Sequence, residues 1–247
     1  MELIVLGSCG TYPSFQRACS SYLIKNDKQS ILIDIGSGAF SNLQKWEDPF
    51  NLKALILTHS HPDHLSDFFA LRYFLELAPG VQTGPLKVYL TPQTEKNIFC
   101  FIGDDSEEKV RNLFDFTPIK MENVKIGDYF VEFCPVTHVD LTYAVKVGLG
   151  DKKIVYSSDT SYDSKLERLA KNADLFICDA TFQGEKGKEY FHMTSSEAGI
   201  MAEKAKVNKL VLTHLWPHMD EEKSLQEAAV NYRGEIIIAK EHQRIGV

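Results

Sequence analysis

The sequence has no long hydrophobic run and few cysteines. None of its apolar stretches approaches the roughly 20 residues that a helix needs to cross a bilayer, so we expect no membrane insertion. The first residues lack the basic and apolar regions of a signal peptide, and we therefore expect a cytoplasmic protein. The five cysteines show no close CxxC spacing, and we interpret them as reduced structural residues.

An excess of basic residues is also missing. The chain carries 27 Lys and Arg against 34 Asp and Glu, which gives a formal net charge of -7. A general nucleic-acid-binding surface normally needs a basic excess, so the net charge disfavours such a surface. It does not exclude a local basic pocket. The 247 residues, 44% of them hydrophobic, suffice for a substantial core. Because no linker or low-complexity tract divides the chain, we expect one domain covering residues 1–247.

Short apolar runs, many of them ending in polar or Gly-containing turns, predict most of the secondary structure. Strands are predicted over Leu3–Gly7, Ser21–Lys25, Ser30–Ile35, Ala54–Thr58, Leu86–Leu90, Tyr129–Cys134, Tyr143–Val147, Lys153–Ser157, Leu175–Asp179, Lys209–Thr213 and Glu235–Ala239. Helices are predicted over Ser37–Trp46, Pro62–Leu77, Thr94–Ile102, Ser164–Lys171, Ser195–Lys206 and Glu221–Asn231. The segment Gly103–Lys125 is the least regular, and we expect it at the surface. Strands followed by helices, repeated in the second half, predict an α/β (α+β) fold: a four-layer αββα sandwich.

Potential metal ligands are concentrated in one short segment after the fourth predicted strand. His59 and His61 are two residues apart, so both imidazoles lie on one side of an extended chain. Asp63 and His64 follow at the start of a predicted helix, and Pro62 stiffens the bend between the two pairs. Imidazole and carboxylate groups are ligands that zinc prefers. The segment therefore predicts a site for divalent metal.

Three further candidates complete the set. His138, Asp159 and His214 each lie just beyond the C-terminal end of a predicted strand, where α/β folds commonly assemble their sites. Taken alone, each is a solvated loop residue as often as a ligand. Together with the first segment, they are better explained as ligands.

This constellation resembles the metallo-β-lactamase superfamily, whose motif is H-x-H-x-D-H, and the resemblance covers essentially the whole chain. It implies two divalent metal ions, with zinc favoured and manganese or iron as alternatives. One ion would be held by His59, His61 and His138. The other would be held by Asp63, His64 and His214, with Asp159 bridging both. Asp34 resembles the buried acid that steadies the metal loop through hydrogen bonds.

The later motifs resemble one branch of that superfamily. Asp159 stands where antibiotic-hydrolysing members generally use cysteine, and His61 stands where flavodiiron oxidoreductases have glutamate. Asp179-Ala-Thr-Phe, then a histidine before a helix at His192, then Leu-Thr-His214 look like ribonuclease Z and its phosphodiesterase relatives. The resemblance implies catalysis by His192 and a supporting role for Asp179. The alternative for His192 is a solvent-facing residue at a helix start.

One feature of ribonuclease Z is missing. Only 20 residues separate His138 from Asp159, which leaves no room for the basic arm that grips tRNA. We therefore expect a small phosphodiester or nucleotide-like substrate, cleaved by a metal-bound hydroxide, with Asp63 relaying a proton. Thioester or lactone hydrolysis, ribonuclease Z-like RNA processing, and a non-catalytic module that keeps its metals are the alternatives.

Weaker signals surround this site. Arg17 follows a Gly-containing loop, where it would either pair with a substrate phosphate or be an ordinary surface charge. Trp216 and His218 are candidates for the other rim, and His242 is expected to be a solvated strand residue. The predicted helix after Pro62 is more apolar than one buried stripe requires. It is either well buried or packs partly on a second copy, as a homodimer.

Overall fold

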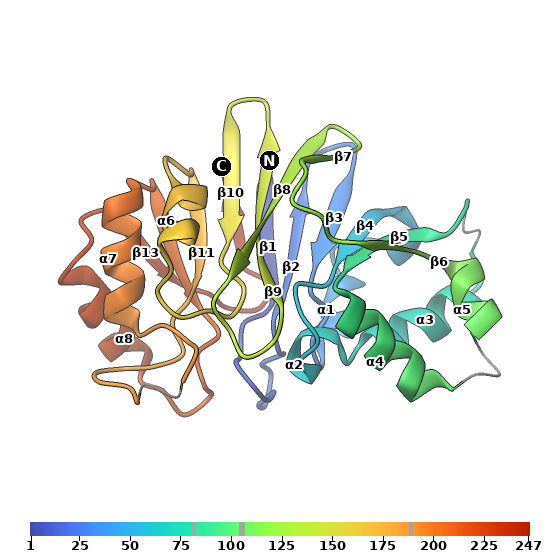
Figure 1. Ribbon diagram of the computed structural model, residues 1–247, viewed down its shortest axis with the longest axis horizontal. Helices are drawn as coiled ribbons and strands as arrows, with labels where there is room; N and C mark the ends of the chain where they lie inside the picture. The colour runs from blue at the N-terminus through green and yellow to red at the C-terminus, as the bar shows by residue number, and fades with distance from the viewer. Residues whose placement is uncertain (81–82, 104–106, 188–189) are drawn as a thin grey trace.

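Two seven-stranded sheets pack face to face, and helices cover the outer face of each (Figure 1). The computed structural model describes residues 1–80, 83–103, 107–187 and 190–247. In Figure 1 the helices α1 to α5 lie on one side of the paired sheets and α6 to α8 on the other. This is the four-layer αββα arrangement that the order of elements predicts, so that prediction is confirmed.

The first sheet has the order β14-β1-β2-β3-β4-β5-β6. Its strands are β1 (Glu2–Gly7), β2 (Ser21–Lys25), β3 (Ser30–Ile33), β4 (Leu52–Ile56), β5 (Leu86–Leu90), β6 (Phe114–Pro118) and β14 (Arg244–Gly246). The helical elements of this half are α1 (Ala39–Leu43), η1 (Pro49–Asn51), α2 (Pro62–Leu65), α3 (Phe68–Leu77), α4 (Pro92–Ile102) and α5 (Glu107–Leu113). Strand β14 joins this sheet by pairing antiparallel to β1, so the two chain ends lie side by side.

The second sheet has the order β13-β12-β11-β10-β9-β8-β7. Its strands are β7 (Val124–Ile126), β8 (Tyr129–Val136), β9 (Thr142–Leu149), β10 (Lys152–Tyr156), β11 (Leu175–Asp179), β12 (Lys209–Thr213) and β13 (Glu235–Ile238). Its helices are α6 (Ser164–Ala170), α7 (Ser195–Ala205) and α8 (Glu221–Ala229). Strands β10 to β13 are parallel, so their C-terminal ends share one edge of the sheet.

The central strands read as continuous apolar runs because both of their faces are buried. In β11, Leu175 and Ile177 point into the core between the sheets, whereas Phe176 and Cys178 point into the core under α6 to α8. Strand β4 alternates in the same way between the central core and the layer under α1 to α5. The strand period of two residues thus fills two cores at once.

One long helix was predicted over Pro62–Leu77, and this prediction is wrong in detail. The chain forms two helices, α2 and α3, separated at Ser66 and Asp67. The backbone N–H of Asp67 donates to Ile35 O at 3.0 Å, and its carboxylate accepts from Phe40 N at 2.9 Å. Asp67 therefore binds the segment after β3, and its N–H does not continue the preceding helix.

The segment Gly103–Lys125 is also more regular than predicted. It contains α5, β6 and the start of β7; residues 104–106 lie outside the described residues. Val110 and Phe114 are buried, and β6 pairs parallel to β5 along its whole length. Alternation over so few residues at a sheet edge gives too weak a period to be distinguished from a loop.

Within the described part of the chain, no helix has the length and apolar character that a bilayer crossing requires. Helix α3 buries Phe68, Leu71 and Leu75 and leaves Tyr73 and Leu77 exposed. One face of this helix is therefore buried, as expected, and the other is exposed. The homodimer stays a prediction.

Candidate metal centre

Five strands end close together, at one edge of the sandwich. Asp34 follows β3, the segment His59–His64 follows β4, and His138, Asp159 and His214 follow β8, β10 and β12. Three residues just beyond strand ends, Asp34, Ser158 and His214, have positive φ values between 54° and 59°. Such a backbone is costly for residues with a Cβ atom and is typical of functional sites.

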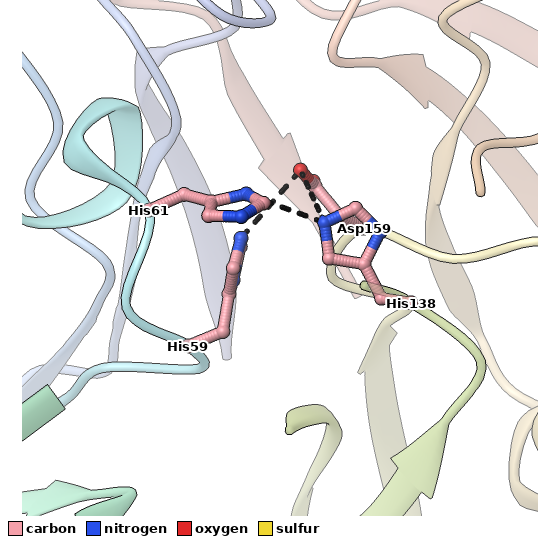
Figure 2. A group of neighbouring side chains, drawn as sticks. All are labelled: His59, His61, His138 and Asp159. Atoms are coloured by element: carbon pink, nitrogen blue, oxygen red, sulfur yellow. Dashed lines mark hydrogen bonds and ion pairs between the residues drawn. The ribbon is translucent and has the colours of Figure 1, made fainter. Parts of the chain in front are cut away.

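The first cluster contains the side chains of His59, His61, His138 and Asp159 (Figure 2). One potential ligand atom from each lies within 4.8 Å of all the others. Asp159 Oδ2 is 3.7 Å from His59 Nε2 and 4.0 Å from His138 Nε2, and His138 Nε2 is 3.3 Å from His61 Nδ1. Figure 2 shows the four side chains pointing toward one another from three separate segments.

The second cluster shares Asp159 and adds Asp63, His64 and His214. His214 Nε2 is 3.1 Å from Asp63 Oδ2 and 3.3 Å from Asp159 Oδ2. His64 Nε2 is 3.3 Å from the other oxygen of Asp159, Oδ1. The Asp159 carboxylate therefore faces both clusters, and the seven predicted ligands lie together.

Hydrogen bonds behind the clusters orient the imidazoles. His64 Nδ1 donates to Asp34 Oδ2 at 2.7 Å, and the Thr58 hydroxyl donates to the same oxygen at 2.9 Å. Because that hydroxyl has used its proton, it accepts from His59 Nδ1 at 3.1 Å. His138 Nδ1 donates to the carbonyl oxygen of Phe191 at 3.0 Å. In each of these rings Nε2 is left with a free lone pair directed at the cluster.

Asp179 supports the opposite side of the site. Its Oδ1 accepts from the Thr181 hydroxyl at 2.7 Å and from Thr181 N at 3.0 Å. Its Oδ2 accepts from Thr160 N at 3.0 Å and from His192 Nδ1 at 2.8 Å. The Thr181 hydroxyl in turn accepts from His214 Nδ1 at 2.8 Å. Although Asp179 and His192 lie close enough to Asp159 and His214 to form a third potential metal-binding group, the four bonds occupy the lone pairs of Asp179. This carboxylate orients histidines and has little capacity left for a metal.

A family model described as "Beta-lactamase superfamily domain" matches residues 29–215, from β3 to just beyond His214. The match covers more than half of the chain and includes all seven clustered residues. The chain belongs to the beta-lactamase superfamily.

Relatives within this superfamily agree with the match. Probable metallo-hydrolase YhfI of Bacillus subtilis is 29% identical over 248 residues, with 97% of each chain covered. The crystal structure of YhfI superposes with a TM-score of 0.89 at 27% identity and covers 99% of both chains. Ribonuclease Z of Thermobifida fusca is 24% identical over 311 residues, which covers 100% of this chain and 94% of the relative. A diphosphatase from the PhnP family superposes with a TM-score of 0.77 at 18% identity, covering 100% and 97% of the chains; this likeness shows the shared fold alone.

The polar atoms left without partners test whether the superfamily's metal ions fit these residues. Among the described residues, His59 Nε2, His64 Nε2 and Asp159 Oδ1 are buried and have no hydrogen-bond partner. Leaving such atoms unpaired is costly, and all three face the clusters. A divalent cation on each side of Asp159 would satisfy them, so the residues fit the ions.

The charge states of the histidines agree with this fit. Burial lowers the pKa of His59, His61 and His138, which keeps these imidazoles neutral as ligands. Burial would also lower the pKa of His64, but the Asp159, Asp34 and Asp63 carboxylates outweigh it and raise that pKa. The same carboxylates would favour a metal cation at His64 Nε2. In His192, burial is outweighed by Asp179, which raises the pKa to about 9.

The structure places the weaker candidates as follows. Arg17 pairs with Glu221 at 3.5 Å, so its role toward substrate stays a prediction. Trp216 and His218 lie beside the loop of residues 10–12, through bonds to Thr11 and Tyr12. His242 was predicted to be a strand residue, and this prediction is wrong. It lies in the turn between β13 and β14, and its Nδ1 accepts from Trp46 Nε1 at 3.0 Å.

Sequence reasoning missed several supporting residues. Thr58 and Thr181 link the buried acids to histidines of the clusters. Thr58 directly precedes His59, and Thr181 lies within the Asp-Ala-Thr-Phe motif, although no role was predicted for either. Asp140 holds the Ser60 hydroxyl between the first two histidines. Thr11 donates its backbone N–H to Asp63 Oδ2 at 2.7 Å. A hydrogen bond from the backbone of a distant loop cannot be predicted from local sequence. Of these residues, only Thr58 and Thr181 could therefore have been suspected.

Proposed function

We propose that residues 1–247 form one hydrolase domain that holds two divalent metal ions and cleaves a phosphodiester. The observation that carries the proposal is the position of His192 beside the clusters. Its ring stacks on that of His214 at 5.2 Å with an interplanar angle of 15°, and Asp179 binds its Nδ1. A protonated imidazole at this place suits a reaction whose leaving group is an alkoxide, because alkoxides need a proton donor.

In this proposal one ion is held by His59, His61 and His138, and the other by Asp63, His64 and His214, with Asp159 between them. A site rich in imidazole and carboxylate favours zinc, and manganese or iron are alternatives. When bound, the two ions would lower the pKa of a shared water molecule and neutralise charge that develops on the phosphoryl oxygens.

The chain's own residues move the protons. Asp63, whose Oδ2 is held by the Thr11 amide, takes the proton from the attacking water. His192 gives its proton to the leaving oxygen as the bond from phosphorus to that oxygen breaks, and Asp179 stabilises the imidazolium before transfer. The products are a phosphomonoester and an alcohol.

We propose a small substrate, and this differs from tRNA processing. Between His138 and Asp159 the chain forms only the hairpin of β9 and β10. The alignment with ribonuclease Z of Thermobifida fusca runs over 311 residues, whereas this chain has 247. That relative therefore carries inserted segments that are missing here, and tRNA is disfavoured as a substrate. A cytoplasmic location and a homodimer through the exposed side of α3 belong to the same proposal.

Metal content and hydrolysis of bis(p-nitrophenyl) phosphate, measured on wild type and Asp159→Ala, test the proposal. We expect about two metals per chain and ready turnover in the wild type, because Asp159 faces both clusters. The variant should bind less metal, and its turnover should be at least about 100-fold lower, because the activation of water by two ions is lost.

The other outcomes decide against parts of the proposal. Turnover of a thioester or a lactone alone would replace phosphodiester cleavage by acyl transfer on the same residues. Cleavage of precursor tRNA at modest enzyme concentration would contradict the small-substrate assignment. Two bound metals with no turnover of any of these compounds would indicate a non-catalytic module.

A further inference from the structure

Aromatic side chains form a group at the rim of the metal centre. We call Tyr12, Phe182, Tyr190, Trp216 and His218 the aromatic platform. Phe182 lies 5.0 Å from Trp216 and 5.1 Å from Tyr190, measured between ring centroids. Trp216 lies 5.5 Å from His218, whose Nδ1 is 3.2 Å from the Tyr12 hydroxyl. The five side chains therefore form one connected group, in which Phe182 and Trp216 meet edge to face.

This platform is fixed to the residues that would hold metal and move protons. Trp216 Nε1 donates to Thr11 Oγ1 at 3.1 Å, and Thr11 N donates to Asp63 Oδ2 at 2.7 Å. At the other end, the Phe182 ring lies 6.1 Å from that of His192. A group resting on the platform would thus lie beside the bond to be broken.

Four of the five platform side chains reach solvent, whereas Phe182 is buried. Tyr12 is 45% exposed and Tyr190 46% exposed, and Trp216 is half-buried. Aromatic rings gathered at the surface beside a cluster of potential ligands are typical of a binding surface. Core packing does not explain them: Phe182 is the one buried residue of the five, and none of the five belongs to the hydrophobic core under α6 to α8.

The charges of the described residues around the centre disfavour a polyanionic substrate. Four loops surround it: residues 8–18, 137–141, 182–192 and 214–222. Apart from His192, the cationic side chains described in these loops are Arg17 and Lys186, and each is paired with a carboxylate, Glu221 at 3.5 Å and Glu197 at 2.6 Å. The same loops present Asp140, Glu185, Asp220 and Glu222. A nucleic acid strand needs unpaired cations along its phosphates, so a substrate with a single diester charge fits better.

We propose that the aromatic platform stacks on a planar aromatic group of the substrate, and that this group is the nucleobase of a small nucleoside phosphodiester. The proposal rests on the phosphodiester cleavage proposed above and names its substrate class. Stacking is tolerant of base identity, because every base has a π face. The platform therefore selects for a base without selecting strongly among bases.

Two esters with the same leaving group test the proposal: thymidine 5'-(4-nitrophenyl) phosphate and methyl 4-nitrophenyl phosphate. Each carries one negative charge and releases 4-nitrophenolate, so only the base and its sugar differ. We expect metal-loaded wild type to prefer the thymidine ester by at least about tenfold in kcat/KM, in line with the worth of one stacked base. In Trp216→Leu this ratio should fall toward one, mainly through a higher KM for the thymidine ester.

Controls separate stacking from damage to the centre. Tyr73→Leu removes an exposed aromatic ring on α3 and should keep the wild-type ratio. If Trp216→Leu does not fold, Tyr12→Leu replaces it, with the same loss of ratio expected.

Equal kcat/KM for the two esters in wild type, or a ratio unchanged in both Trp216→Leu and Tyr12→Leu, overturns the stacking proposal alone. Turnover of neither ester by the metal-loaded enzyme overturns the proposed function, and the substrate class falls with it.

Discussion

At the residue scale, two buried aspartates take different roles because their neighbours differ. Asp179 accepts four hydrogen bonds from groups around it, so it orients histidines. Asp159 keeps Oδ1 free of hydrogen bonds among the described residues and has histidine nitrogens on both sides. A carboxylate left unpaired in this way is suited to bridge two cations.

We expect His192→Ala to lower kcat by roughly 100- to 10,000-fold, the usual worth of a general acid, for a diester with an alkoxide leaving group such as thymidylyl-(3'→5')-thymidine. For bis(p-nitrophenyl) phosphate, whose leaving group needs no proton, kcat should change much less. The metal content should stay at the wild-type value, because His192 lies outside the seven clustered ligands. His242→Ala is the matched control, since that ring bonds to Trp46 and is not among the clustered residues, and its turnover should be unchanged. Loss of metal in His192→Ala would instead make this residue a ligand.

Replacing Thr181 by valine removes the hydroxyl that lies between Asp179 and His214. The affinity for the second metal should fall by about 10- to 100-fold, as is usual when a ligand's hydrogen-bond partner is lost. Competition with a chelator of known affinity measures this change. Thr181→Ser keeps the hydroxyl and should bind metal nearly as wild type does; an equal loss in both variants would contradict the role given to the hydroxyl.

At the element scale, the segment from His59 to Asp67 is held against the chain that follows β3. Ile35 N donates to His64 O at 2.8 Å, and Asp67 N donates to Ile35 O at 3.0 Å. A Cβ atom on Gly36 would lie 2.0 Å from Asp63 O and 2.7 Å from Cys19 Cβ. Only glycine allows this close approach, which sets the position of the ligand-bearing loop and α2.

We therefore expect Gly36→Ala to displace the Asp63 backbone. The free energy of unfolding should drop by about 1–3 kcal/mol, as in other overpacked sites, and metal affinity should drop with it. Denaturant titration and metal counting on the same samples check both effects. Gly246→Ala is the control, because its added Cβ would meet nothing within 4 Å; similar behaviour of the two variants would argue against a steric role for Gly36.

At the scale of the whole molecule, the candidate metal centre joins the two halves of the sandwich. His59, His61, Asp63 and His64 follow a strand of the first sheet, whereas His138, Asp159 and His214 follow strands of the second. Each cluster draws on both sheets. Bound ions would therefore stabilise the packing of one half on the other.

Removal of metal should lower the melting temperature. An ion present at 100 times its dissociation constant stabilises the fold by about 2.7 kcal/mol, which corresponds to a shift of about 5–10 °C for a chain of this length. Differential scanning calorimetry with and without a chelator measures the shift. Asp159→Ala should show little response to the chelator, and a wild-type melting temperature unaffected by chelation would contradict the account.

The αββα layers followed from the sequence because the central strands are apolar on both faces and the flanking helices are strongly periodic. The ligand motif was equally visible, since His59, His61, Asp63 and His64 are adjacent in the chain. The helix break at Asp67 could not be predicted, because its cause is a hydrogen bond to Ile35, 32 residues earlier in the chain. Strand β6 was not predicted for a related reason: its run is short, and its extended conformation is stabilised by pairing with β5.

For the candidate site, too, local sequence predicted some residues, whereas others depend on contacts between distant segments. Side chains that act through their own chemistry, such as His138, Asp159 and His214, could be proposed from their positions after strands. Thr11 and Asp140 contribute through the folded path of distant loops, and no local pattern in the sequence records that path.

The central claim is a pair of metal ions bridged by Asp159, and anomalous diffraction from crystals of the metal-loaded protein tests it most directly. We predict two peaks about 3.5–4 Å apart, one bounded by His59, His61 and His138 and the other by Asp63, His64 and His214. A single peak, or a peak held by Asp179 and His192, would contradict the account.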